Sequence, residues 1–137
     1  MKVLVLYVNS FSCRPAAKNL DSTPDCTEET VQTNALLAFI QAEEKDQEKE
    51  LKSREKKLVN HLKWVSRKNS CRRIILHSFA HLSGSKADAG FTFELLNKVE
   101  ERLRNAGFET VQTPFGYFVD MKIDAPGFSM ARVWADL

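Results

Sequence analysis

Two short segments of the chain carry residue types that can do chemistry. The first is Phe79-Ala80-His81-Leu82-Ser83, which follows an apolar run, and the second is Pro114-Phe115-Gly116-Tyr117-Phe118. An imidazole in a turn can orient water or a hydroxyl group near neutral pH. A glycine beside two aromatic rings lets a ligand approach the backbone, and the rings offer flat faces to a base or a ribose. These residues indicate a binding corner with His81 as the candidate catalytic group.

Each segment also has a purely structural interpretation. A histidine in a turn often does no more than hydrogen-bond the backbone. Pro114-Phe115-Gly116 is also typical of a hairpin turn whose aromatic residues anchor the core, because turns commonly use Pro and Gly. The sequence contains no nucleophile elbow, dinucleotide-binding glycine motif, P-loop or paired metal ligands. Redox, kinase and zinc-hydrolase functions therefore lack support, and we expect no metal and no cofactor.

Length and composition set the broad class of the protein. The 137 residues are 43% hydrophobic and 28% charged, which fits one compact domain over residues 1–137. The three cysteines are widely spaced and odd in number, so the sequence predicts neither a disulfide framework nor a zinc knuckle. A reducing cytoplasm is the expected compartment. The apolar run from Val3 to Val8 is too short for a membrane span, and we expect no membrane partner.

Charge is distributed unevenly in the middle of the chain. Residues 43–50 are mainly acidic, whereas residues 52–73 hold nine Lys or Arg against Glu55 alone. One interpretation is a solvated helix with acids near its start and bases near its end, as the helix dipole favours. The other interpretation is a surface that faces RNA phosphates.

The hydrophobic pattern predicts an α+β domain with about six strands and two principal helices. Strands are expected at both ends of the chain and helices in the middle, which favours α+β over a doubly wound parallel sheet. The polar stretch 9–33 is expected to hide a short strand or a functional loop. Gly107 is expected to end the second helix with a left-handed cap. The predicted strands are 2–8, 35–40, 73–79, 108–113, 117–123 and 130–134, and the predicted helices are 46–68 and 92–106.

The order and spacing of these segments resemble the N-terminal editing domain of archaeal-type threonyl-tRNA synthetase over nearly the whole chain. The matching segments are the opening Met-Lys-Val-Leu, Ala38-Phe39-Ile40, Phe79 to Ser83, Ala106-Gly107-Phe108 and Pro114 to Tyr117. The resemblance implies a fold similar to D-aminoacyl-tRNA deacylases, usually a homodimer. It also implies binding of the terminal adenosine of tRNA and metal-independent cleavage of the aminoacyl ester.

The resemblance assigns roles to particular residues. Ala80 and His81 would line the pocket, with His81 catalytic, and the facing wall would be formed by Phe115, Gly116 and Tyr117 with Phe118 beside them. Three positions depart from the family pattern. The family commonly has a tyrosine and then a lysine where this chain has Phe118 and Val119, and Arg132 aligns with an acidic position. Lys122 is three residues beyond Val119 on an expected strand, so it should point to the opposite face.

Three functions follow from the resemblance. The leading hypothesis is hydrolysis of seryl-tRNA formed on threonine tRNA. The first alternative is a catalytically impaired module of the same fold that binds aminoacyl-tRNA or adenosine, and the second is a general D-aminoacyl-tRNA deacylase. The implied partners are the aminoacylated 3′ end of tRNA, a second copy of the chain and threonyl-tRNA synthetase.

Overall fold

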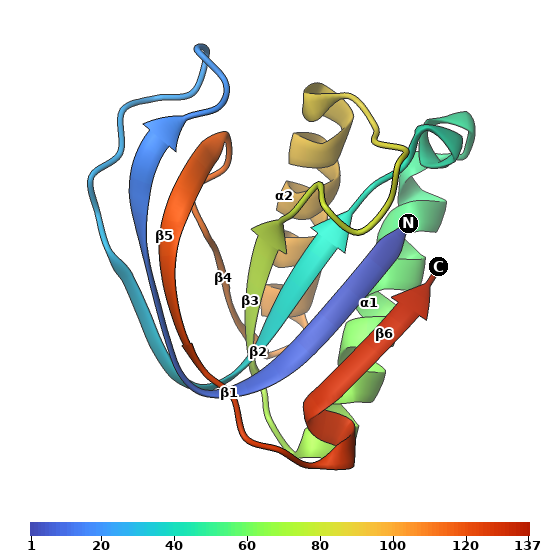
Figure 1. Ribbon diagram of the computed structural model, residues 1–137. Coiled ribbons are helices and arrows are strands. Elements are labelled where there is room, and N and C mark those ends of the chain that lie inside the picture. The colour runs from blue at the N-terminus through green and yellow to red at the C-terminus, as the bar shows by residue number, and fades with distance from the viewer.

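One long strand, β1 (Lys2–Lys18), organises the sheet in the computed structural model, which describes residues 1–137 throughout (Figure 1). On one side β1 pairs antiparallel with β2 (Thr30–Gln41). On its other side β5 (Tyr117–Asp124) pairs with the second half of β1, and β6 (Arg132–Asp136) pairs with the first half. β3 (Arg73–Ser78) and β4 (Glu109–Gln112) extend the sheet in parallel from β2, giving the order β4-β3-β2-β1-β5.

Two helices, α1 (Leu51–Asn69) and α2 (Ala89–Asn105), cover one face of the sheet (Figure 1). Their buried side chains, among them Leu58, Leu62 and Leu96, join sheet residues such as Val5 and Leu36 in a core cluster of 19 residues. The sheet bends strongly, and a second cluster of 7 buried residues forms on its other face. Neither helix has the length and apolar character needed to cross a membrane.

The α+β class, the six strands and the two principal helices agree with the expectation from sequence. The polar stretch 9–33 is where β1 continues to Lys18 and β2 begins at Thr30. The first helix was expected from residue 46, and this is wrong: η1 (Glu44–Glu48) is a 3₁₀ turn and α1 begins at Leu51. The last strand begins at Arg132 after the 3₁₀ turn η2 (Ser129–Ala131), two residues later than expected.

Gly107 ends α2 as expected. Its φ of +88° is left-handed, a conformation that glycine adopts without steric cost. The amide of Phe108 donates to the carbonyl of Leu103 at 3.0 Å, and the amide of Gly107 donates to the carbonyl of Arg104 at 2.9 Å. This is a Schellman arrangement, which satisfies the last carbonyls of the helix and turns the chain into β4.

The segment Pro114-Phe115-Gly116 is not the hairpin turn that its composition allowed. β4 pairs with β3 and β5 pairs with β1, so the two strands lie at opposite edges of the sheet. The segment therefore crosses the end of the sheet where β2 and β3 terminate. This crossing places its aromatic residues opposite the loop that follows β3.

Candidate active site

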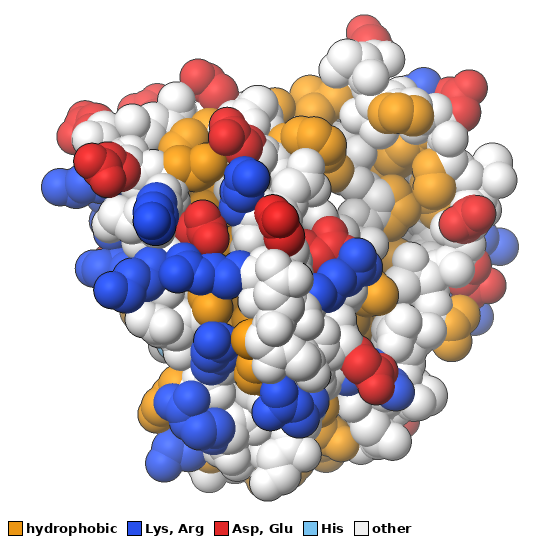
Figure 2. All heavy atoms as spheres, turned by 180° about the vertical axis from the view of Figure 1, so that it is seen from behind, with side chains coloured by type: hydrophobic (Ala, Val, Ile, Leu, Met, Phe, Trp, Pro, Cys, Tyr) orange, Lys and Arg blue, Asp and Glu red, His pale blue; other side chains and the backbone are white.

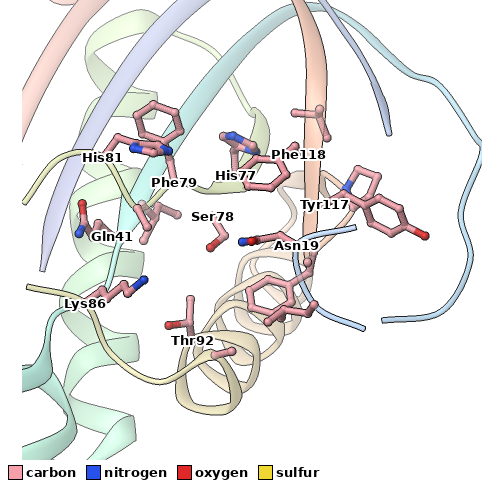
Figure 3. A pocket seen from close by; sticks show the side chains of 18 of the residues that line it. Asn19, Gln41, His77, Ser78, Phe79, His81, Lys86, Thr92, Tyr117 and Phe118 are labelled. Atoms are coloured by element: carbon pink, nitrogen blue, oxygen red, sulfur yellow. The ribbon is translucent and has the colours of Figure 1, made fainter. Parts of the chain in front are cut away.

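A cavity of about 320 Å³ lies at the carboxyl ends of β2 and β3, between the loop after β3 and the segment 114–118 (Figure 3). This volume is at the lower end of the range of ~300–1,000 Å³ found for small-molecule sites. All of the residues that the sequence nominated for the site line this one cavity: Ala80, His81, Phe115, Gly116, Tyr117 and Phe118. The structure thus brings together two segments that are more than thirty residues apart in sequence.

The first wall is the loop that follows β3, and the side chain of Gln41 holds it in place. Its Nε2 donates to the carbonyls of Ser83 and Ser85 at 3.0 and 2.9 Å, and its Oε1 accepts from the Leu82 amide at 2.5 Å. His81 extends from this loop and packs edge-on against the ring of Phe79, with ring centroids 5.0 Å apart. The imidazole of His81 is exposed to the cavity and to solvent.

A second anchor of the loop is the carboxylate of Glu43, which accepts a hydrogen bond from Ser83 Oγ at 2.6 Å. The ammonium group of Met1 lies 2.9 Å from the other oxygen of Glu43. Burial by itself would raise the pKa of Glu43, but the Ser83 hydrogen bond and the ammonium group outweigh it and lower the pKa to about 2. The loop that carries His81 is therefore tied to a carboxylate that stays ionised at neutral pH.

The facing wall depends on Gly116. Its φ is +83°, and a Cβ atom at this position would clash with the side chain of Thr23. Its carbonyl accepts hydrogen bonds from the amides of Asn19 and Leu20 at 2.7 and 3.1 Å. Only glycine fits this close approach without strain, so the residue fixes the β1–β2 loop against the wall of the cavity.

Tyr117 presents its ring to the cavity, but its hydroxyl group is engaged elsewhere. The hydroxyl donates to the carbonyl of Pro24 at 2.8 Å and accepts from the amide of Cys26 at 2.9 Å. Figure 3 shows this hydroxyl directed away from the cavity. Phe115 is half-buried against Phe93, whereas Phe118 is 55% exposed. The facing wall therefore offers aromatic faces and backbone groups rather than a free phenol.

His77 is a lining residue that the sequence analysis missed. It is only 5% exposed, and burial lowers its pKa to about 4. Its Nδ1 lies 2.7 Å from Thr113 Oγ1, and its ring packs edge-on against Phe39. The imidazole of His77 is therefore neutral at pH 7 and adds no charge to the cavity.

Lys86 was also missed, and it is the one Lys, Arg, Asp or Glu among the 21 lining residues. It forms no ion pair, and Figure 3 shows its ammonium group directed into the cavity, on the side of Ser78. The amide of the next residue, Ala87, donates to the carbonyl of Ala42 at 2.9 Å, which fixes the backbone that carries the lysine. The cavity therefore holds one unpaired positive charge.

The positions that depart from the family pattern lie in different places. Val119 lines the cavity and adds only apolar surface. Arg132 does not line it, and its Nη1 donates to the carbonyl of Pro126 at 2.9 Å. Lys122 also lies outside the lining, as the alternation along β5 predicted. No three His, Cys, Asp or Glu side chains lie close enough together to hold a metal ion.

The mixed six-stranded sheet with two helices on one face defines the protein as a single α+β domain. A solved structure described as c-Myc DNA unwinding element binding protein superposes on it with a TM-score of 0.62. The match covers 100% of this chain and 99% of that one at 15% sequence identity. At this identity the likeness concerns the fold alone.

Sequence comparison identifies the family. The model of the archaea-specific editing domain of threonyl-tRNA synthetase matches residues 1–137, and the chain belongs to this family. Threonine–tRNA ligase of Thermococcus kodakarensis is 31% identical over 135 residues, covering 97% of this chain and 22% of the ligase. The ligase of Staphylothermus marinus is 25% identical over 137 residues, with the same coverage of 97% and 22%. The chain thus spans about a fifth of the length of these relatives.

Proposed function

We propose that this domain hydrolyses the ester of serine attached to threonine tRNA. The observation that carries the proposal is the cavity in which His81 faces the Phe115-Gly116-Tyr117 wall, within a domain of the synthetase editing family. The aromatic wall suits the terminal adenosine, and the exposed backbone at Gly116 suits a close-lying ribose. The aminoacyl group would then point toward the loop that carries His81 and Lys86.

The proposed reaction is the addition of water to the ester carbonyl. His81 orients the water, and the attack produces a tetrahedral intermediate whose carbonyl oxygen carries a negative charge. Collapse of the intermediate breaks the bond to the ribose oxygen, which takes up the proton that the attacking water has lost. The products are free serine and a tRNA with a free terminal hydroxyl group. The tRNA's own neighbouring ribose hydroxyl can assist in positioning the water.

Lys86 is the group that we assign to the developing negative charge. Val119 provides no ammonium group at the position where the family commonly has lysine, whereas Lys86 reaches the same cavity from the loop after β3. A fixed donor at the oxyanion of an acyl-transfer reaction lowers the barrier by ~2.7–4 kcal/mol in well-formed sites. The unpaired Lys86 is therefore able to supply part of the stabilisation that a lysine at position 119 would provide.

Discrimination between serine and threonine rests on size. The two amino acids differ by one methyl group, and the small residues Ala80, Ala87 and Ala89 are among those that line the cavity. Exclusion of a methyl group by packing provides only ~1–3 kcal/mol, or roughly 10–200-fold. We therefore assign the domain a second selection step, which acts in the cytoplasm after aminoacylation and removes serine from tRNA that was wrongly charged.

The proposed partners are the aminoacylated 3′ end of tRNA, threonyl-tRNA synthetase and a second copy of the chain. β5 is an edge strand, and it exposes Phe118, Met121 and Ile123. An exposed apolar edge strand readily pairs with another chain. We expect light scattering to give the mass of a dimer at micromolar concentration, and a monomeric mass would contradict this part of the proposal.

A catalytically impaired binding module is the second candidate, and Val119 is the observation that favours it. Binding of a non-hydrolysable seryl-adenosine analogue, measured together with turnover of seryl-tRNA, separates the two functions. The deacylase predicts both binding and turnover. Binding without turnover would leave only the binding module, and absence of binding would contradict both.

A further inference from the structure

The outer face of α1 carries a group of cations, which we call the basic face. Five of its members are exposed and Lys63 is half-buried. The only ion pairs made by side chains of α1 are those of Arg54 and Glu55, neither of which belongs to the basic face. Figure 2 shows Lys and Arg side chains gathered on this side of the molecule. The basic face consists of Lys52, Lys56, Lys57, Lys63, Arg67 and Lys68.

Stabilisation of the helix explains only some of these charges. The first turn of α1 contains no acidic residue, because the acids of this region lie in η1 and its flanks. Lys52 instead lies in that first turn, where the helix dipole disfavours a cation. Lys52 and Lys56, like Lys63 and Arg67, are four residues apart and repel each other. The helix as it is formed therefore lacks the acidic start, and the helix dipole accounts only for Arg67 and Lys68, which lie in its last turn.

An exposed aromatic residue lies among these cations. Trp64 is 39% exposed, and Lys68 Nζ lies 5.8 Å from the centroid of its ring. His61 stacks beside it with ring centroids 6.0 Å apart, and burial lowers the pKa of this histidine. The face thus combines unpaired cations with apolar aromatic surface, which is the combination that nucleic-acid-binding surfaces use.

The position of the basic face relates it to the cavity. η1 leads into α1, and Gln47 of η1 exchanges hydrogen bonds of 3.0 and 2.8 Å with Asp88, two residues from Lys86. The amide of Glu44 also donates to Ser85 Oγ at 3.1 Å. The N-terminal end of α1 therefore adjoins the loop that forms one wall of the cavity. A polyanion lying along α1 would have one end directed at that wall.

We propose that the basic face binds the phosphate backbone of the base-paired stem next to the aminoacylated 3′ end of tRNA. This inference rests on the proposed function for the identity of the RNA. Contacts to phosphates fix the register of a nucleic acid on a protein without reading its sequence. The basic face would thus position the stem, and the cavity would receive the terminal adenosine with its amino acid.

The test compares two variants of equal charge change. The first replaces three members of the basic face, Lys56→Gln, Lys63→Gln and Arg67→Gln. The control replaces three exposed cations outside α1 and its flanks, Arg14→Gln, Lys98→Gln and Lys122→Gln. Both use glutamine, which has good helix propensity, and circular dichroism checks that both variants fold.

Binding of uncharged threonine tRNA is measured as a function of salt. We expect the basic-face variant to bind at least 10-fold more weakly than the control at 0.15 M salt. Its slope of log affinity against log salt should be smaller by about 2–3, because each lost phosphate contact lowers the slope by ~0.7–0.9. For seryl-tRNA hydrolysis KM should rise, while hydrolysis of a minimal seryl-adenosine ester should stay within twofold of wild type.

The outcomes separate this inference from the proposed function. The basic-face variant could lose tRNA binding while neither the wild type nor the two variants hydrolyse seryl-tRNA or the seryl-adenosine ester. In that case the inference stands and the deacylase proposal fails. Equal tRNA affinity and salt slope in the two variants would overturn the inference, whether or not hydrolysis occurs. Unchanged RNA binding together with lost binding to purified threonyl-tRNA synthetase would overturn it as well, and would assign the face to a protein partner.

Discussion

Lys86 provides the sharpest perturbation of the proposed chemistry. It is the one unpaired charge that lines the cavity, so Lys86→Met removes the ammonium group while keeping a long apolar side chain. Two unit charges about 4 Å apart interact by roughly 1 kcal/mol in bulk water and roughly 4 kcal/mol near a protein surface. Because Lys86 is exposed, we take a value near the lower limit. A loss of about 1.4 kcal/mol in the transition state lowers kcat 10-fold.

The assay is single-turnover hydrolysis of seryl-tRNA, with the affinity for a non-hydrolysable seryl-adenosine analogue measured in parallel. Lys86→Met should lower the rate at least 10-fold and change the analogue affinity less than twofold, and Lys86→Arg should retain most of the rate. Lys98→Met is the matched control, because Lys98 lies on the exposed face of α2 and its one ion pair is with Glu101.

Val119→Lys adds an ammonium group to the cavity from the wall opposite Lys86, so it tests whether a lysine at either position serves the same charge. Introduced into Lys86→Met, it should restore the rate by about 10-fold, and in the wild-type background its effect should be smaller. Such non-additivity is expected of two groups that serve the same charge. A rate that is insensitive to Lys86→Met, with Val119→Lys equally effective in both backgrounds, would refute the assignment of Lys86 to the oxyanion.

Three further predictions concern the site and its support. His81→Ala should lower kcat by about 100-fold or more, since general acid–base groups contribute a factor of ~10²–10⁴ to the rate. An unchanged affinity for the seryl-adenosine analogue would show that the effect lies in the chemical step. Gly116→Ala should reduce the free energy of unfolding in urea by about 1–2 kcal/mol from its left-handed backbone alone, whereas Gly127→Ala, whose Cβ meets nothing within 4 Å, serves as a neutral control. Stability should fall as pH drops from 6.5 to 4, because His77 protonates readily only in the unfolded chain, and fall further from 4.5 to 2 as Glu43 is neutralised. In thermal melts, His77→Gln should reduce the pH dependence of stability between pH 6.5 and 4, and Glu43→Gln should reduce it between pH 4.5 and 2. An unaltered pH profile would contradict the pKa given for that residue.

Most of the fold could be predicted from local patterns. The apolar run of β3 and the helical period that ends at Gly107 are strong signals, because burial and capping are decided within a few residues. The second half of β1 was missed because Pro15 discourages a strand. In the structure the proline coincides with a register shift against β5, where a missing amide is tolerated. The signal available in the sequence was the alternation of the apolar Phe11 and Cys13 with polar neighbours, and the structure buries both.

The course of the segment 114–116 could not be predicted locally. A hairpin and a crossing use the same turn residues, and the choice depends on which distant strand each flank pairs with. Local patterns did predict that His81 and the aromatic residues of segment 114–118 line one cavity. They could not predict that Lys86 lines it too, for the same reason. The direction of its side chain depends on a loop held by Gln41, and that contact joins residues about forty positions apart.

The measurement that tests the central claim most directly is hydrolysis of threonine tRNA charged with serine or with threonine by the same wild-type preparation. We expect release of serine well above the spontaneous rate, and release of threonine at least ~10-fold slower, because exclusion of one methyl group provides that much discrimination. Equal rates for the two amino acids, or no hydrolysis of the seryl ester by a protein that binds the seryl-adenosine analogue, would contradict it.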